Sequence, residues 1–443
     1  MDSEGSVEHQ PAFSGNSSII EATTKSGEGT PDDAEKRRRE QCMILAPDFA
    51  RSSLQCALDL HEVIRESAGS RNILFSPFML SSALMALYNG ARGRTAEQIA
   101  RAARLGYDEP PVVSSCLPLW HSLLFPTWPD SNRRNFEIHH DCCLVYDKGI
   151  RISDGYRKWL SRWCRVEAED FANDPTDGVV FPTRMTAWIG ALTSFSCKTP
   201  EDASFWSEVD RSTSLFLLSL LFIKGKWRHV FHVTRGFFHE TQKKSKVVRM
   251  MSHTGRFRMT HSEEMGASFL ELPYREHKKT MVILLPDPPN SLRDLERKLN
   301  AHHILACLDK LEDKGPLNVS VPMFRVSDVI DLKEALPALG VNDAFQPDAD
   351  FSTLCDSAAR VSFARHVAVF HARERSTSQT PKCSGAQLPA GSTSTPPAAD
   401  DDGEQKDEEV KFIVDRPFLF LIMNSEPKAV LLFGSVRKIF AWK

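Results

Sequence analysis

The residues of this chain that could carry catalysis are Ser, His, Asp and Cys, and their spacing matches no catalytic motif. The sequence contains no GxSxG, HExxH or GxGxxG pattern and no phosphate-binding loop. The densest cluster is His139-His140-Asp141 with Cys142, in a pattern typical of a β-strand. Because adjacent strand residues point to opposite faces, these side chains do not converge on one metal ion. We therefore expect no catalytic residues, no metal and no cofactor.

The cysteines form no recognisable framework. None of the 10 makes a CxxC pair, and no two pairs have zinc-ribbon spacing. The adjacent Cys142 and Cys143 cannot readily bond to each other, given the geometry that a disulfide requires. We expect buried or free thiols in a reducing compartment.

The composition is that of a globular chain with ample material for a large core, since 41% of its 443 residues are hydrophobic. The net charge of -3 indicates no general attraction to nucleic acid or membranes. No apolar run reaches the roughly 18 residues of a membrane helix, and the first residues lack the pattern of a secretory signal. We expect a cytoplasmic or nucleocytoplasmic protein, with an extracellular location as the alternative if the N-terminus is not the one given.

Each of two basic runs has two interpretations, a targeting or binding function and a solvent-exposed surface without one. Residues 1–45 are rich in Ser, Gly, Glu and Thr and are predicted to be a disordered polar tail. Within the tail, Lys36 to Arg39 resembles a nuclear address, but such a run is more often a solvated tail. Lys243, Lys244 and Lys246 in a predicted hairpin could bind a polyanion such as heparin, although a solvated face is the more common role.

Apolar periodicity predicts helices early in the chain and strands later. This order, without regular strand–helix alternation, predicts an α+β fold with large, mainly antiparallel sheets. Residues 107–135 are rich in proline and are predicted to be irregular. Helices are predicted at 48–68, 76–90, 95–105, 185–196, 292–308 and 332–341, and strands at 136–147, 212–223, 264–274, 281–286, 317–326, 361–372, 411–423 and 429–436.

The most unusual stretch lies between the predicted strands at 361–372 and 411–423. Residues 375–409 contain almost no large apolar side chain. A polar connection of this length between two strands is well outside the usual range, so it is either a functional loop or a disordered insert.

Six blocks of this sequence, in the same order, resemble the serpins, the serine-protease-inhibitor superfamily. The resemblance extends from roughly Asp48 to Phe440. The blocks are NILFSPFMLSSALMALYNGARGRTAEQI at 72–99, FIKGKW at 222–227, LELPYREHKKTMVILLPD at 270–287, LNVSVPMFRV at 317–326, HVAVF at 366–370, and RPFLFLIM with FGSV, ending at Val436.

The resemblance implies one serpin domain over 46–443, with three mainly antiparallel sheets and about nine helices. It also implies that residues 375–410 are an extended reactive-centre loop, offered as bait to a serine or cysteine protease. In serpins the cleaved loop enters the central sheet as a new strand and distorts the trapped protease. This mechanism needs a metastable native state and no catalytic residue in the serpin. We expect a monomer that binds neither nucleic acid nor membrane.

Residues at the start of the loop depart from the serpin pattern. By alignment from His366, the hinge consists of Glu374, Arg375, Ser376, Thr377, Ser378, Gln379, Thr380 and Pro381. Glu374 and Thr377 match the family. Gln379 would place an amide in a buried position, at a cost of about 1–3 kcal/mol if it found no partner. Pro381 lacks the N–H that a central strand needs.

Further residues take their expected roles from the resemblance. Lys382 is a candidate scissile-bond residue for a trypsin-like protease, and Leu388 for a chymotrypsin-like one. The shutter beneath the central sheet retains Ser76 and His366, but has Met79 where serpins have serine and Ser219 where they have asparagine. Trp227 corresponds to the breach, where the loop would enter the sheet.

Two hypotheses about function follow. In the first, the protein inhibits a serine-type endopeptidase by loop insertion. In the second, it is a non-inhibitory serpin that acts as a binding, carrier, chaperone-like or decoy-substrate protein. The family pattern supports the first hypothesis, and Gln379, Pro381 and the long acidic loop support the second.

Overall fold

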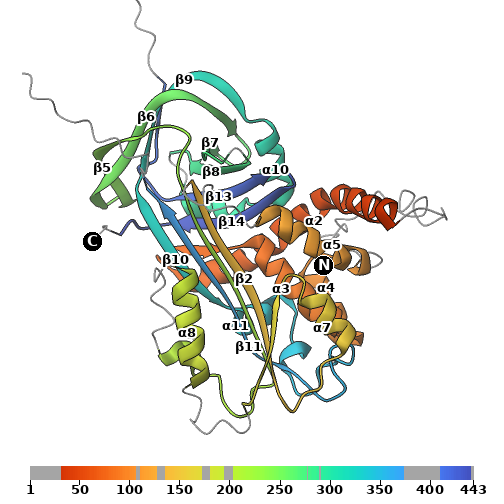
Figure 1. The fold of residues 1–443 in the computed structure, drawn as a ribbon. Helices are drawn as coiled ribbons and strands as arrows, with labels where there is room; N and C mark the ends of the chain where they lie inside the picture. Colours follow the sequence, from red (N-terminus) through yellow and green to blue (C-terminus); the bar gives the residue numbers. More distant parts are fainter. Residues whose placement is uncertain are drawn as a thin grey trace, which may run out of the picture.

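Two β-sheets and a set of helices that cover them make up the fold (Figure 1). The computed structural model describes residues 31–105, 110–126, 135–171, 180–193, 203–276, 278–288, 291–373 and 410–440. Within these ranges the α-helices are α2 (Pro31–Ala68), α3 (Pro77–Gly90), α4 (Gly93–Ala102), α5 (Pro110–Leu124), α7 (Asp154–Leu160), α8 (Val180–Leu192), α9 (Leu292–Arg297), α10 (Ala301–Asp309) and α11 (Leu332–Ala335). Three short 3-10 helices are η2 (Ala203–Trp206), η3 (Leu336–Leu339) and η4 (Asp343–Phe345).

The strands divide into a five-stranded and a nine-stranded sheet. The five-stranded sheet has the order β10 (Phe324–Asp331), β11 (Val361–Ala372), β4 (Leu215–Gly225), β2 (Phe136–Asp147) and β3 (Arg165–Glu169). The nine-stranded sheet has the order β1 (Ile73–Phe75), β14 (Lys428–Val436), β13 (Phe418–Ser425), β8 (Lys279–Pro286), β7 (Ala267–Pro273), β6 (Lys244–Ser262), β9 (Glu312–Pro322) and β12 (Lys411–Ile413), with β5 (His232–Thr241) paired to β6.

The sequence predicts an α+β class and three sheets. The class is confirmed, but the hydrogen-bond ladders join two of the expected sheets into one. The cause is β6, a strand of 19 residues. Its first half pairs with β5, residues 250–259 pair with β9, and its last residues pair with β7, so this one strand joins the two expected sheets.

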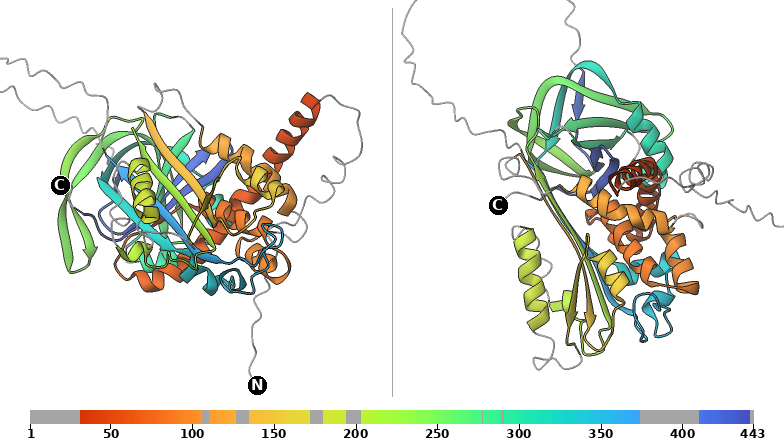
Figure 2. Two further views of the ribbon diagram at one scale, coloured as in Figure 1. Left: turned by 60° about the horizontal axis from the view of Figure 1, so that its bottom comes forward. Right: turned by 45° about the vertical axis from the view of Figure 1, so that its right-hand side comes forward.

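Helices cover both faces of the five-stranded sheet. Helix α8 lies on one face, and α3 lies on the other with much of the remaining helical layer (Figures 1 and 2). Under α8, a small apolar cluster packs Phe181, Met185 and Ile189 against sheet residues such as Phe216 and Leu220. The larger core fills the opposite side. Because both faces are covered, the central strands β4 and β11 are mainly apolar.

Several sequence predictions need correction. Residues 31–45, predicted as disordered tail, form the start of α2, whose residues Cys42 and Leu45 are buried. Residues 1–30 lie outside the described part of the chain. Residues 110–124, predicted as irregular because of their prolines, form α5 with Pro118 inside the helix. The predicted helix at 292–308 is two helices, α9 and α10. The predicted strand at 317–326 is divided between β9 and β10, and the one at 411–423 between β12 and β13.

A disulfide between Cys42 and Cys116 joins α2 to α5. The expectation of unpaired thiols is therefore wrong for these two residues. It missed them because they are 74 positions apart and no spacing rule connects them. The other described cysteines, Cys56, Cys142, Cys143, Cys164, Cys307 and Cys355, are free and buried.

Replacing both Cys42 and Cys116 by serine is expected to lower the free energy of unfolding by about 2–4 kcal/mol. The bond closes a long loop, so its loss enlarges the unfolded ensemble. Urea unfolding with and without reductant measures the effect. The serine variant should be insensitive to reductant, whereas the native protein should shift to match it. Equal midpoints for the native protein in both conditions would show that the disulfide does not stabilise the fold.

In the described part of the chain, no helix is long and apolar enough to span a membrane.

Candidate functional site: the junction between β4 and β11

The centre of the five-stranded sheet is a parallel pair, β4 with β11, in a sheet whose strands are otherwise mostly antiparallel. The pairing runs from Val361 opposite Leu215 to His371 opposite Lys224. No other described strand lies between the two. We call this boundary the seam. All residues of β11 are buried, which explains why most of its residues are apolar.

The seam ends where the described chain is interrupted. β11 leads to Arg373, and the chain is described again from Val410, which precedes β12. β12 pairs in parallel with β9 in the nine-stranded sheet. Residues 374–409 therefore connect a strand of one sheet to a strand of the other.

The hinge and scissile-bond candidates fall in this connection. Glu374 to Pro381, Lys382 and Leu388 all lie outside the described residues. Their roles remain predictions from the sequence.

Trp227, predicted to be at the breach, lies at the Arg373 end of the seam. Its indole ring is buried and stacks on Tyr274, with 4.5 Å between ring centroids. The indole Nε1 donates a hydrogen bond to the carbonyl oxygen of Arg373 at 2.7 Å. Trp227 thus fixes the backbone of the last described residue before the connection.

His366 lies near the middle of the seam and joins three elements. It is the register partner of Ser219 on β4, and its Nδ1 lies 2.8 Å from the Ser219 hydroxyl. The backbone N–H of Ser76, which caps α3, donates to His366 Nε2 at 2.9 Å. Because Nε2 accepts a hydrogen bond, the ring proton must be on Nδ1 and is donated to Ser219. The imidazole is therefore neutral in this arrangement.

The two departures from the serpin shutter pattern have different consequences. Ser219, which stands where serpins have asparagine, still bonds to His366. Met79, which stands where serpins have serine, contributes only its backbone N–H, bonded to the Ser76 hydroxyl at 3.1 Å. Its side chain is fully buried in the apolar core. The hydrogen-bond network is thus present through Ser76, Ser219 and His366.

Burial lowers the pKa of His366 from 6.5 to about 3. A histidine whose pKa is lower in the folded state favours folding when neutral. Its contribution is therefore complete above pH 6.5 and is lost as the pH falls toward 3. At about pH 5, stability should be about 2 kcal/mol lower from this residue alone.

Urea unfolding of the native protein and of His366→Ala at several pH values isolates this contribution. The difference in stability between the two proteins should narrow as the pH falls from 6.5. A constant difference over this range would contradict the prediction.

The sequence suggested two other clusters, the His139-His140-Asp141 run and the lysines at 243–246. His139 faces Glu137, at 3.3 Å between His139 Nε2 and Glu137 Oε1, whereas His140 stacks on Phe125 on the opposite face. Across the described residues, no group of three or more His, Cys, Asp or Glu side chains could hold a metal ion. Lys244 pairs with Glu240, and Lys246 donates to the carbonyl oxygen of Ile439.

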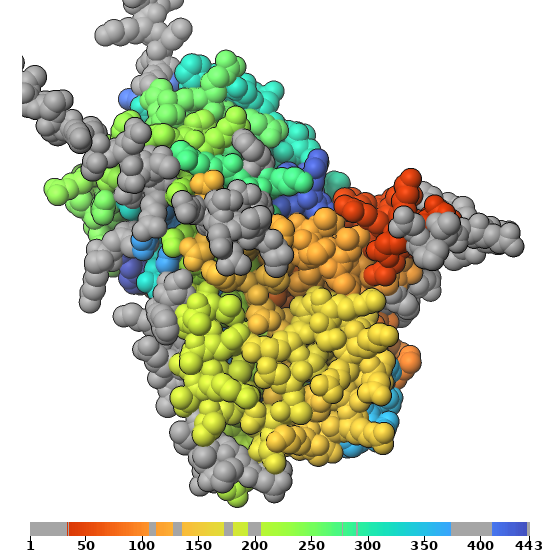
Figure 3. All heavy atoms as spheres, viewed as in Figure 1, coloured from red at the N-terminus to blue at the C-terminus, as the bar shows by residue number. Residues whose placement is uncertain are grey.

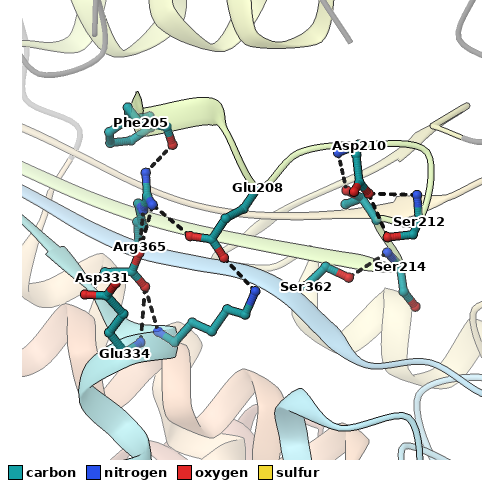
Figure 4. Close-up of polar contacts among 11 residues, drawn as sticks. Phe205, Glu208, Asp210, Ser212, Ser214, Asp331, Glu334, Ser362 and Arg365 are labelled. Atoms are coloured by element: carbon teal, nitrogen blue, oxygen red, sulfur yellow. Dashed lines mark hydrogen bonds and ion pairs between the residues drawn. The ribbon is translucent and has the colours of Figure 1, made fainter. Parts of the chain in front are cut away.

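Arg365, which stands beside His366 on β11, was not predicted from the sequence as a functional residue. This arginine is only 9% exposed, and it bonds to Glu208 and Asp331 (Figure 4). The signal was present in the sequence, because a single charged residue interrupts an otherwise apolar strand at Arg365.

A protein with this central parallel seam, with its last strands in a second sheet and a long connection between them, is of the serpin class. The family model described as serpin (serine protease inhibitor) matches residues 51–439. This chain belongs to the serpin family.

Curated relatives and solved structures agree. "Iris" of Ixodes ricinus is 31% identical over 396 residues, covering 87% of this chain and 98% of the relative. "Intracellular coagulation inhibitor 2" of Tachypleus tridentatus is 28% identical, covering 83% of this chain and 86% of the relative. Uncleaved ovalbumin has a TM-score of 0.73 at 22% identity, covering 88% of this chain and 99% of that structure. Human thyroxine-binding globulin has a TM-score of 0.72 at 19% identity, covering 88% and 98%.

Proposed function

We propose that this serpin inhibits a serine-type protease by presenting residues 374–409 as bait and then inserting part of that segment into the seam. The observation that carries the proposal is the seam itself, where β4 and β11 pair directly and β11 continues into the bait segment. An entering strand would exchange one parallel pairing for two antiparallel ones. This exchange gains backbone hydrogen bonds, which makes insertion favourable.

In this proposal the protein supplies no catalytic group. The protease cleaves the bait, and insertion then carries the attached protease away before hydrolysis is complete. We further propose that the network of Ser76, Ser219 and His366 holds the seam closed before cleavage, and that Trp227 holds its entrance at Arg373. The relatives named as inhibitors support this assignment. A monomer suffices for each step.

A second candidate function is a non-inhibitory serpin, which uses the same scaffold to bind a partner or to serve as a decoy substrate. Gln379 and Pro381 favour it, because each opposes the burial of the segment as a strand. Thyroxine-binding globulin, solved with its hormone, has a similar fold and binds a small molecule. That likeness extends to the fold alone.

One experiment separates the two candidates without knowledge of the target. The bait is cut with a trace of trypsin, the cut is located by mass spectrometry, and the melting temperatures of intact and cut protein are compared. Insertion would raise the melting temperature by tens of degrees. An unchanged melting temperature would overturn inhibition by insertion and leave the non-inhibitory function.

A second measurement tests trapping directly. The intact protein is mixed with trypsin-like and chymotrypsin-like proteases and run on denaturing gels. A complex that survives denaturation supports the inhibitor. Complete cleavage by every protease, without such a complex, favours the decoy substrate.

The compartment is also a proposal. A cytoplasmic or nucleocytoplasmic location is supported by one relative that is named an intracellular inhibitor. The disulfide between Cys42 and Cys116 favours the extracellular alternative, since disulfides persist mainly in oxidising compartments.

A further inference from the structure

Arg365 is the one Lys, Arg, Asp or Glu residue in β11, and its guanidinium is bonded on three sides. It donates to Asp331 Oδ2 from Nη2 at 2.8 Å and from Nε at 3.1 Å. Nη2 also donates to Glu208 Oε1 at 3.0 Å, and Nη1 donates to the carbonyl oxygen of Phe205. Figure 4 shows these contacts converging on the Arg365 side chain.

The partners of Arg365 come from outside the seam. Asp331 ends β10, whereas Phe205 and Glu208 belong to the segment that runs over the sheet before β4 begins. Lys333 of α11 donates to Glu208 at 2.6 Å and strengthens the attachment. We call residues 205–209 the seam cover.

Aromatic rings attach the seam cover to both seam strands. Phe216 of β4 and Phe363 of β11 stack across the seam, 4.3 Å between centroids and 7° from parallel. Trp206 of the cover lies nearly parallel to both, at 6.2 Å from Phe216 and 5.9 Å from Phe363. Arg365 lies over the rings of Phe205 and Phe363. The cover thus bridges the two strands on which it rests.

These contacts conflict with a strand between β4 and β11. Neighbouring strands lie about 4.8 Å apart, so an added strand would move Phe216 and Phe363 to about twice that separation. Their stacking would be lost, and Trp206 could remain against only one of them. The cover leads into β4 through residues 210–214, while Arg365 is carried by β11. Separation of the strands therefore requires the cover to detach from Arg365.

We propose that Arg365 and residues 205–209 form a lock that holds β4 and β11 together at the Val361 end of the seam. When the seam opens from the Arg373 end, the lock stops the opening at the level of His366. The consequence for the proposed function, on which this part rests, is that complete insertion requires the lock to be released. The lock is separate from the His366 network, because adjacent residues of β11 face opposite sides of the sheet.

Hydrogen exchange of the full-length, uncut protein tests the lock. In Arg365→Met the side chain keeps an unbranched apolar stem and loses the guanidinium with its bonds to the cover. Backbone amides of 215–218 and 361–365 should exchange at least about tenfold faster than in the native protein, because the opening free energy of this end falls. The matched control is Arg256→Met, which removes an exposed arginine–aspartate pair in the other sheet. It should leave these amides unchanged.

A merely local loss of stability would loosen β10 as much as β4, because Arg365 also bonds to Asp331. The lock predicts that Arg365→Met accelerates exchange more in 215–218 than in 326–330. Equal acceleration in both strands, or none in 215–218, overturns the proposal. If Arg365→Met does not fold, Trp206→Leu tests the same claim, because it removes the aromatic bridge and leaves Arg365 paired.

The cut protein distinguishes failure of the lock from failure of the proposed function. Faster exchange in the variant, with no rise in melting temperature after cutting in either protein, would uphold the lock and overturn insertion. If the higher melting temperature appears at the same rate after cutting in both proteins, and hydrogen exchange in the uncut variant is unchanged, insertion is upheld and the lock is overturned.

Discussion

Replacing Gln379 and Pro381 together by alanine is expected to speed strand insertion roughly a hundredfold. Proline supplies no N–H to a central strand, and a buried glutamine amide loses its hydrogen bonds to water. A penalty of about 3 kcal/mol on insertion, which these two residues together would impose, corresponds to that factor. Insertion competes with hydrolysis of the bond that joins the protease to the cut segment. A hundredfold change in the insertion rate therefore decides which outcome prevails.

The rate is measured after rapid trypsin cleavage, from the fraction of molecules that have acquired the higher melting temperature at successive times. Leu388→Ala is the matched control, since it changes the same segment beyond the hinge and should not alter the rate. The double variant should also yield more protease complex on denaturing gels. Equal rates for native and double-variant protein would show that the hinge does not limit insertion.

His366→Ala is expected to lower the free energy of unfolding by about 3–5 kcal/mol at neutral pH. The imidazole is 1% exposed, so its removal leaves a cavity. It also leaves the Ser76 N–H and the Ser219 hydroxyl without the partner that each has now. Urea unfolding at neutral pH measures the change.

Ser219→Ala provides the comparison for this variant. It removes one hydrogen bond and creates only a small cavity, so a loss of about 1 kcal/mol is expected. If the two substitutions cost the same, the contribution of His366 lies in its bond to Ser219 alone. A loss below about 1 kcal/mol in His366→Ala would contradict the network as a determinant of seam stability.

Sequence patterns predicted the seam strands because both are buried on two faces, which requires nearly continuous apolar residues. The start of α3 was also predictable, since Ser76 and Pro77 have the capping and first-turn preferences of those residue types. Local chemistry determines each of these features, so local sequence is sufficient to recognise them.

Features that depend on distant partners were not predictable in the same way. Pro110 and Pro118 argued against a helix, but packing of α5 against α2 overrides that preference. Arg365 needs partners from residues 205–208 and from Asp331, and nothing in the sequence of β11 names them. The pairing of Cys42 with Cys116 likewise depends on how two helices meet.

The position of the connection at 374–409 determines whether the two fragments stay together after the chain is cut there. The strands that follow it, β13 and β14, are inner strands of the nine-stranded sheet, bonded to β8 and β1 from the earlier part of the chain. A cut at Lys382 therefore divides the polypeptide without dividing the particle. The two fragments remain a non-covalent heterodimer that migrates as one species until it is denatured. Separately produced fragments would be expected to reassemble, so this serpin can be split into complementary halves at a position that its own architecture already provides.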